Sequence, residues 1–209
     1  MVPRFIIQLA AQLGADHTLL QEEQDQLIRN IEHIKEIVAM QQNYARVSGF
    51  LERVSVATLV DDALQINTAG LSRHGVQVVR EYAQVPPVTA DKHKVLQILV
   101  NLVHNAKYAL DESRRLDKRL TVSIGMNGNN RLKVTVCDNG VGIPPENLTR
   151  IFSHGFSTRK GGHGFGLHSG ANAAKEMGGQ LSVQSEGPGK GATFVLELPL
   201  VSQENGTTN

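Results

Sequence analysis

The chain has 209 residues, of which 40% are hydrophobic and 4% aromatic, and its formal net charge is +1. This composition is typical of a globular protein and excludes an intrinsically disordered chain, while the balanced charge argues against nucleic acid or an anionic membrane surface as a partner. The single cysteine, Cys137, excludes an internal disulfide framework and a cysteine-based zinc site.

Residues 1–50 are predicted to form a helical region distinct from the rest of the chain. Pro3–Leu13 has apolar residues on one face and predicts a short amphipathic helix, which Gly14 and Asp16 then interrupt. A longer helix is predicted over about residues 19–48, which are polar and contain no glycine or proline. Its seam, in which most steps are three or four residues, comprises Leu20, Leu27, Ile31, Ile34, Val38, Gln41, Ala45 and Ser48.

Such a seam is typical of a helix that packs along a partner helix. The spacing therefore favours a two-helix or dimeric bundle, in which the polar Gln41 could set the register. One long helix that packs on its own domain is the alternative.

Residues 51–200 are predicted to form a second domain, followed by a flexible tail over residues 201–209. Helices are predicted over Val56–Leu71, from Asp91 to about Leu110, and over Leu167–Met177. Strands are predicted over Val76–Tyr82, Arg119–Gly125, Leu132–Cys137, Leu181–Ser185 and Ala192–Leu198. This order favours an α+β two-layer sandwich, with a mixed, mostly antiparallel sheet and helices on one face.

The first segment that suggests chemistry is Asp138–Pro144, with the sequence DNGVGIP. It places a carboxylate at the end of a buried strand, where it could accept a hydrogen bond from an amine, and its glycines let the backbone approach a flat ligand. An ordinary Asx turn at a strand end is the alternative.

The helix over Gln97–Lys107 carries amides every four residues, at Gln97, Asn101 and Asn105, so they lie on one face. Buried amides need partners, and a hydrated Mg²⁺ with phosphates is a suitable one. The alternative is that they cap nearby loops.

Two further segments suggest a polyphosphate. Ile151–Lys160 has two aromatic residues that could hold a segment on the core, followed by two hydroxyls and two cations. Gly161–Leu167, with the sequence GGHGFGL, opens a helix, where free N–H groups bind anions. Its glycine spacing differs from the dinucleotide-binding fingerprint, so a Rossmann fold is disfavoured. The alternatives are a solvated loop for Ile151–Lys160 and a flexible hinge loop for Gly161–Leu167.

Together, these four segments resemble the N, G1, F and G2 boxes of the ATP-binding domain of sensor histidine kinases of two-component systems. That domain belongs to the group that includes gyrase B, Hsp90 and MutL. The resemblance covers roughly Val54–Pro199 and is strongest to the nitrogen-sensor-like branch. It implies the Bergerat ATP-binding fold preceded by a long dimerisation-type helix, with ATP and Mg²⁺ as cofactors.

The resemblance also implies roles on the adenine side. Asp138 would accept from the adenine amino group, and Gly140 and Gly142 would admit the base against Ile143. Thr193 would bond the base through water.

On the phosphate side, the resemblance implies that Asn105 ligates Mg²⁺ with support from Asn101. Arg159 would contact a phosphate, and Leu167 would start the helix that follows. The glycines that would wrap the phosphates are Gly162, Gly164 and Gly166.

Two departures from the family pattern qualify the activity. Gln97 stands where ATP-hydrolysing relatives carry the glutamate that activates water, and an amide cannot act as a base, so slow hydrolysis is expected. Neither His17 nor His33 has the sequence context of a phosphoacceptor. The chain is therefore expected to be a portion of a longer protein-histidine kinase whose acceptor histidine lies upstream.

The expected partners are a second copy of the chain, through the helical region, and the receiver domain of a response regulator. No nucleic acid and no membrane contact by this chain are expected. The location is expected to be cytoplasmic, although the full-length protein could be membrane-anchored. A non-catalytic ATP- or ADP-binding module that signals by partner contact remains the alternative, and an ATP-driven clamp of the gyrase or MutL type is disfavoured by Gln97.

Overall fold

The computed structural model describes residues 51–158 and 164–200, together with scattered residues between Ile6 and Leu27. The chain divides into two compact units, Met1–Ser48 and Gly49–Asn209, and each is described by itself. No helix among the described residues is long and apolar enough to cross a membrane.

In the first unit, every described residue between Ile6 and Leu27 is helical. These residues include Gly14 and Asp16, so the predicted interruption at these two positions is wrong. A glycine inside a helix costs only about 1 kcal/mol, which neighbouring helix-forming residues can offset. The predicted seam residues from Ile31 to Ser48 lie outside the described residues.

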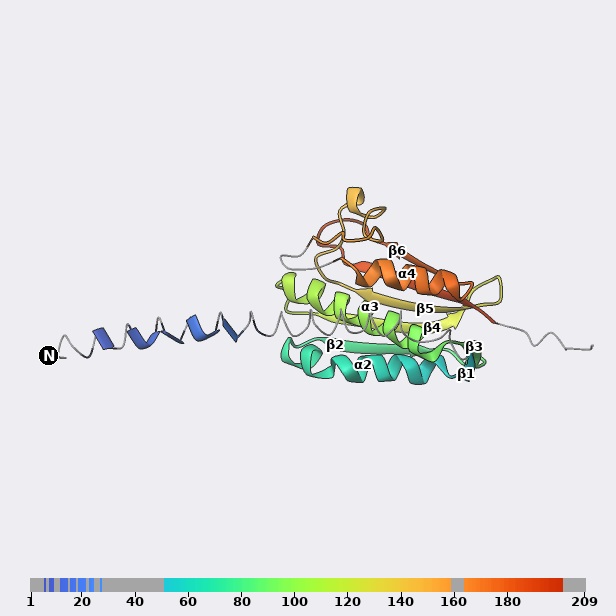
Figure 1. Ribbon diagram of the computed structural model, residues 1–209, viewed down its shortest axis with the longest axis horizontal. Coiled ribbons are helices and arrows are strands. Elements are labelled where there is room, and N and C mark those ends of the chain that lie inside the picture. The colour runs from blue at the N-terminus through green and yellow to red at the C-terminus, as the bar shows by residue number, and fades with distance from the viewer. Residues whose placement is uncertain are drawn as a thin grey trace, which may run out of the picture. The chain divides into compact units, whose positions relative to one another are not determined.

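The second unit is built on a five-stranded mixed sheet with the order β2-β4-β5-β7-β6 (Figure 1). β2 pairs parallel with β4, and the other neighbours pair antiparallel. The strands are β2 (Gln77–Tyr82), β4 (Arg119–Met126), β5 (Arg131–Asp138), β6 (Gln180–Gln184) and β7 (Ala192–Pro199). The predicted α+β class with a mostly antiparallel sheet is confirmed.

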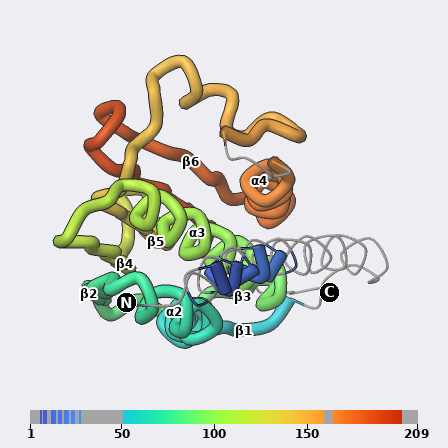
Figure 2. Tube along the Cα trace, turned by 90° about the vertical axis from the view of Figure 1, so that its left-hand side faces the viewer, coloured from blue at the N-terminus to red at the C-terminus, as the bar shows by residue number. Residues whose placement is uncertain are grey.

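Three helices cover one face of this sheet (Figures 1 and 2). They are α2 (Val56–Arg73), α3 (Lys92–Glu112) and α4 (Gly166–Glu176). α3 lies between the other two and packs against both. Along β4, Leu120, Val122 and Ile124 are buried and alternate with half-buried residues, because successive side chains of a strand point to opposite faces.

Smaller elements complete the unit. β1 (Glu52–Val54) and β3 (Val88–Ala90) form a separate two-stranded antiparallel sheet, and η1 (Pro145–Asn147) is a single 3₁₀ turn. The two strands were not predicted, because three residues are too few to establish an alternating pattern.

The start of α3 is fixed by Asp91, as predicted. One carboxylate oxygen of Asp91 accepts from the N–H groups of His93 at 3.0 Å and Lys94 at 3.2 Å. These bonds satisfy two of the four N–H groups that a helix start leaves unpaired.

Replacing Asp91 tests this cap. Asp91→Ala is expected to lower the free energy of unfolding by about 1 kcal/mol, whereas Asp91→Asn keeps an oxygen acceptor and should lose little of it. Urea unfolding followed by circular dichroism measures both. Equal losses for the two variants would contradict the capping role.

Candidate functional site

Asp138 is the last residue of the central strand β5, and only 4% of its surface is exposed. Its Oδ1 accepts from the N–H of Gly140 at 2.9 Å, and its carboxylate also accepts from the N–H of Ala192. Burial raises the pKa of this carboxyl from 3.8 to about 6, although both hydrogen bonds lower it. A buried carboxylate with a pKa displaced in this way is typical of a functional site.

The bond between Asp138 and Gly140 is an Asx turn, so this simpler interpretation of the DNGVGIP segment also holds. The turn uses Oδ1 of the carboxylate. It therefore leaves acceptor capacity for a ligand, because an ionised carboxylate has about four lone-pair positions.

Two glycine-containing loops meet beside Asp138, the 139–143 loop after β5 and the 185–191 loop between β6 and β7. The N–H of Gly191 donates to the carbonyl of Gly140 at 3.2 Å, and the N–H of Gly189 donates to the carbonyl of Val141 at 2.6 Å. Gly191 has a φ of +73°, and a Cβ there would overlap the Asp138 carbonyl oxygen. Only glycine permits this approach of the two loops.

The 139–143 loop is also held on its other side. The N–H of Val141 donates to the carbonyl of Ala109 near the end of α3 at 3.1 Å. A Cβ on Gly140 would lie 2.5 Å from the carbonyl carbon of Ala109, so the loop and the helix are in direct backbone contact.

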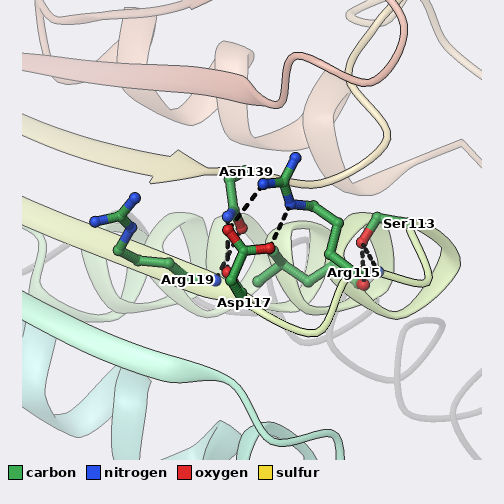
Figure 3. A network of polar contacts seen from close by, with 6 residues as sticks. Ser113, Arg115, Asp117, Arg119 and Asn139 are labelled. Carbon is green, nitrogen blue, oxygen red and sulfur yellow. Dashed lines mark hydrogen bonds and ion pairs between the residues drawn. The ribbon is translucent and has the colours of Figure 1, made fainter.

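Asn139 connects this turn to the segment between α3 and β4 (Figure 3). Its Oδ1 accepts from the N–H of Arg119, and its amide group donates to the carbonyl of Asp117, both at 2.8 Å. Arg115 in turn makes two hydrogen bonds, of 2.8 and 2.9 Å, to the Asp117 carboxylate. The residue next to Asp138 is thereby fixed in place.

The three predicted amides, Gln97, Asn101 and Asn105, are half-buried on α3. Asn101 lies against the start of α4, since a Cβ on Gly166 would overlap its amide group. Among the described residues, the buried Nδ2 of Asn101 has no hydrogen-bond partner. An unpaired buried donor beside a helix N-terminus is suited to an anion such as a phosphate.

α4 begins at Gly166, one residue before the predicted start at Leu167. Phe165 precedes it and makes no side-chain cap, so its side chain does not occupy the first N–H groups. Gly164, with a φ of +69°, packs against the backbone of Gly155 and Phe156. Arg159 and Gly162 lie outside the described residues.

The segment before α4 is held on the core, as its aromatic residues predict. Phe152 and Phe156 pack against the hydrophobic core. The ring of His168 on α4 bonds through Nδ1 to the Phe152 carbonyl at 2.9 Å and through Nε2 to the Asn172 amide at 3.1 Å. Because a carbonyl only accepts, Nδ1 donates to Phe152.

Thr193 does not join this group, which corrects the role that the resemblance implied. Its hydroxyl donates to the Cys137 Sγ at 3.3 Å, on the face of the sheet opposite to Asp138. The residue paired with Asp138 is Ala192, which contributes its backbone N–H. Side chains alternate between the two faces along β7, so this alternation could have shown that Ala192 and Thr193 lie on opposite faces of the sheet.

A model of the histidine kinase-, DNA gyrase B- and HSP90-like ATPase family matches residues 90–202, which include Asp138, the three amides of α3 and the start of α4. The chain belongs to this ATPase family.

The similar curated proteins are sensor kinases. Sensor histidine kinase ZraS of Salmonella typhi is 32% identical over 171 residues, which are 76% of this chain and 35% of that protein. Adaptive-response sensory kinase SasA of Crocosphaera subtropica is 34% identical over 136 residues, which are 62% of this chain and 34% of that protein. The chain thus spans about a third of the length of these relatives.

Solved structures share the fold. The nucleotide-free catalytic domain of histidine kinase ThkA matches with a TM-score of 0.63 and 23% identity, over 72% of this chain and 96% of that one. Full-length ShkA in complex with AMPPNP matches with a TM-score of 0.70 and 24% identity, over 87% of this chain and 37% of that one. This likeness shows the α+β fold alone.

Two glycines of the 185–191 loop test the close approach to Asp138. Gly189 and Gly191 have φ values of +76° and +73°, but a Cβ on Gly189 would meet nothing within 4 Å. Gly189→Ala should therefore lower the free energy of unfolding by about 1 kcal/mol, because alanine is strained at a positive φ. Gly191→Ala should lower it by at least about 2 kcal/mol more, because its Cβ would also overlap the Asp138 backbone. Thermal or urea unfolding compares them, and equal costs would contradict the close packing.

The raised pKa of Asp138 predicts how stability depends on pH. Because the folded-state pKa of about 6 lies above 3.8, the folded protein binds this proton more tightly than the unfolded chain. Relative to Asp138→Asn, the wild-type free energy of unfolding should fall by about 2 kcal/mol as the pH rises from about 4 to about 7.

Urea unfolding at a series of pH values measures this difference. Glu146→Gln, which removes an exposed carboxylate from η1, is the control and should follow the wild-type profile. A pH-independent difference between wild type and Asp138→Asn would show that the Asp138 pKa is not raised.

Proposed function

We propose that this chain is the ATP-binding catalytic portion of a sensor histidine kinase. In this proposal it transfers the γ-phosphate of ATP to a histidine upstream of the chain, for relay to a response regulator. The observation that carries the proposal is the buried Asp138 carboxylate, held by two backbone donors between glycine loops. The sensor kinases among the similar proteins support it.

On the adenine side, the Asp138 carboxylate accepts a hydrogen bond from the amino group of the base. An ionised carboxylate is an acceptor only, so it favours adenine over a base that presents a carbonyl at this position. Because Gly140 and Gly142 have no Cβ, the turn packs closely against Ala109 and Gly187 and brings its backbone beside the base, and Ile143 packs against the face of the base.

On the phosphate side, Asn101 donates through its unpaired Nδ2, and the first N–H groups of α4 lie beside it. Asn105, one helical turn further along α3, would ligate Mg²⁺ through its amide oxygen, and the phosphates would supply further ligands. When bound, Mg²⁺ neutralises charge on the phosphates. Arg159, Gly162, Gly164 and Gly166 complete the phosphate contacts.

For transfer, the acceptor imidazole nitrogen bonds to the γ-phosphorus while the bond to the β–γ bridging oxygen breaks and ADP leaves. The chain's own contribution is to orient the phosphates and stabilise their charge. Gln97 on α3 cannot remove a proton from water, so a positioned histidine competes well with hydrolysis.

The helical region would join two copies of the chain through the seam residues around Leu27, and a receiver domain would be the phosphate acceptor of the relay. We assign this portion to the cytoplasm, where a free thiol such as that of Cys137 stays reduced.

Asp138→Asn tests adenine recognition. The amide presents a donor to the adenine amino group, so ATP affinity should fall at least about a hundredfold, as expected when a buried polar group is left unpaired. Isothermal titration calorimetry of the 209-residue chain with ATP and Mg²⁺ measures this loss. Asp62→Asn on α2 is the control, and equal affinities in the wild type and Asp138→Asn would exclude the assigned role.

Incubation with ATP radiolabelled at the γ-phosphate tests the transfer step. The purified chain should bind ATP but acquire little acid-labile label, and it should hydrolyse ATP slowly. A peptide that carries the acceptor helix of the parent kinase should become labelled when it is added. Stoichiometric label on His17 or His33 would instead place the acceptor within this chain.

A further inference from the structure

The hydroxyl of Ser185, the residue after β6, connects the two loops that meet beside Asp138. It donates to the carbonyl of Gly191 at 2.6 Å and accepts from the N–H groups of Ile143 at 3.0 Å and Gly187 at 3.3 Å. A serine hydroxyl has one donor and two acceptor positions, so its whole hydrogen-bonding capacity is used.

The bond to Gly191 also orients a donor to Asp138. The carbonyl of Gly191 and the N–H of Ala192 belong to the same peptide group, which is planar and rigid. That N–H donates to the Asp138 carboxylate. Fixing the carbonyl end of this peptide group therefore fixes the direction of the N–H at its other end.

The bond from Ile143 holds the other of the two loops. Ile143 is the residue proposed to pack against the base, and its backbone N–H is held by the same hydroxyl. The Ser185 side chain thus adds a third connection between the 139–143 loop and the 185–191 loop, beside the two backbone bonds from Gly189 and Gly191.

We infer that Ser185 is a positioning residue for adenine recognition, which acts through the Ala192 peptide on Asp138 and through the backbone of Ile143. This inference rests on the proposed ATP-binding function. It predicts that loss of the hydroxyl weakens contacts with the base and leaves contacts with the phosphates intact. The reason is that the three hydrogen bonds of the Ser185 hydroxyl go to Gly191, Ile143 and Gly187, and not to Asn101 or the start of α4.

The test compares ATP and inorganic tripolyphosphate, each with Mg²⁺, by calorimetry on the 209-residue chain. Ser185→Ala leaves a carbonyl and two N–H groups without their partner, so the dissociation constant for ATP should rise roughly tenfold. The dissociation constant for tripolyphosphate should not change. Ser185→Thr, which keeps a hydroxyl, should restore most of the ATP affinity.

The pH profile provides a second measure. With the Ala192 N–H less well oriented, the pKa of Asp138 should rise further. As the pH is lowered, Asp138 of Ser185→Ala should therefore become protonated, and ATP binding should weaken, at a higher pH than in the wild type. The control is Ser182→Ala on β6, since Ser182 alternates with the buried Leu181 and so faces away from the helices. It should keep the wild-type affinity and profile.

Three results would overturn the inference. They are an unchanged ATP affinity in Ser185→Ala, equal losses for ATP and tripolyphosphate, and no recovery in Ser185→Thr. If Ser185→Ala does not fold, Ser185→Cys, which is close in size and a weak hydrogen-bonding group, takes its place with the same expectations. Failure of the wild-type chain to bind ATP would instead overturn the proposed function, and this inference with it.

Discussion

Asp138 carries its carboxylate into the interior at the end of a central strand, where burial favours the neutral form. Two backbone N–H groups offset part of that cost, one from Gly140 within the turn itself and one from Ala192, which is paired with Asp138 across the sheet. Glycine at 191 lets the 185–191 loop approach the Asp138 backbone, and glycine at 140 lets the turn lie against Ala109 of α3. The free energy of unfolding at neutral pH is therefore lower than it would be with a neutral group here, while the hydrogen-bond acceptor stays buried and fixed in direction. Such a cost in stability is expected of a binding site that discriminates between polar groups.

α3 is the common support of both halves of the site. Near its end, the backbone of Ala109 contacts the turn that follows Asp138, and in its middle Asn101 contacts the start of α4. A helix is stiff over such a length, so the distance between Asp138 and the start of α4 is set by the helix rather than by flexible loops. The cap at Asp91 and the buried face of α3 therefore contribute to the geometry of the site as well as to stability.

Much of this architecture was predictable because local signals agree with the fold. Asp91 has the chemistry of a helix cap, and Asn127 accepts from the N–H groups of Asn129 and Arg131 in the turn that joins β4 to β5. The part that escaped prediction depends on distant pairing. The sequence does not distinguish Thr193 from Ala192, because neighbouring residues of a strand differ in which face they occupy and the strand register decides that face. Ser185 gave no sequence signal, since its partners are in loops brought together only by the folded sheet.

The pairing of Asp138 with Ala192 has a further consequence for how the protein is made. β7, which pairs with β5, belongs to the last part of the described chain. Ala192, the second donor to the carboxylate, is therefore synthesised about fifty residues after Asp138. Pairings between distant segments form late, because the intervening chain must be ordered first. A growing polypeptide on the ribosome therefore lacks the finished surroundings of the Asp138 carboxylate until almost the whole unit has emerged.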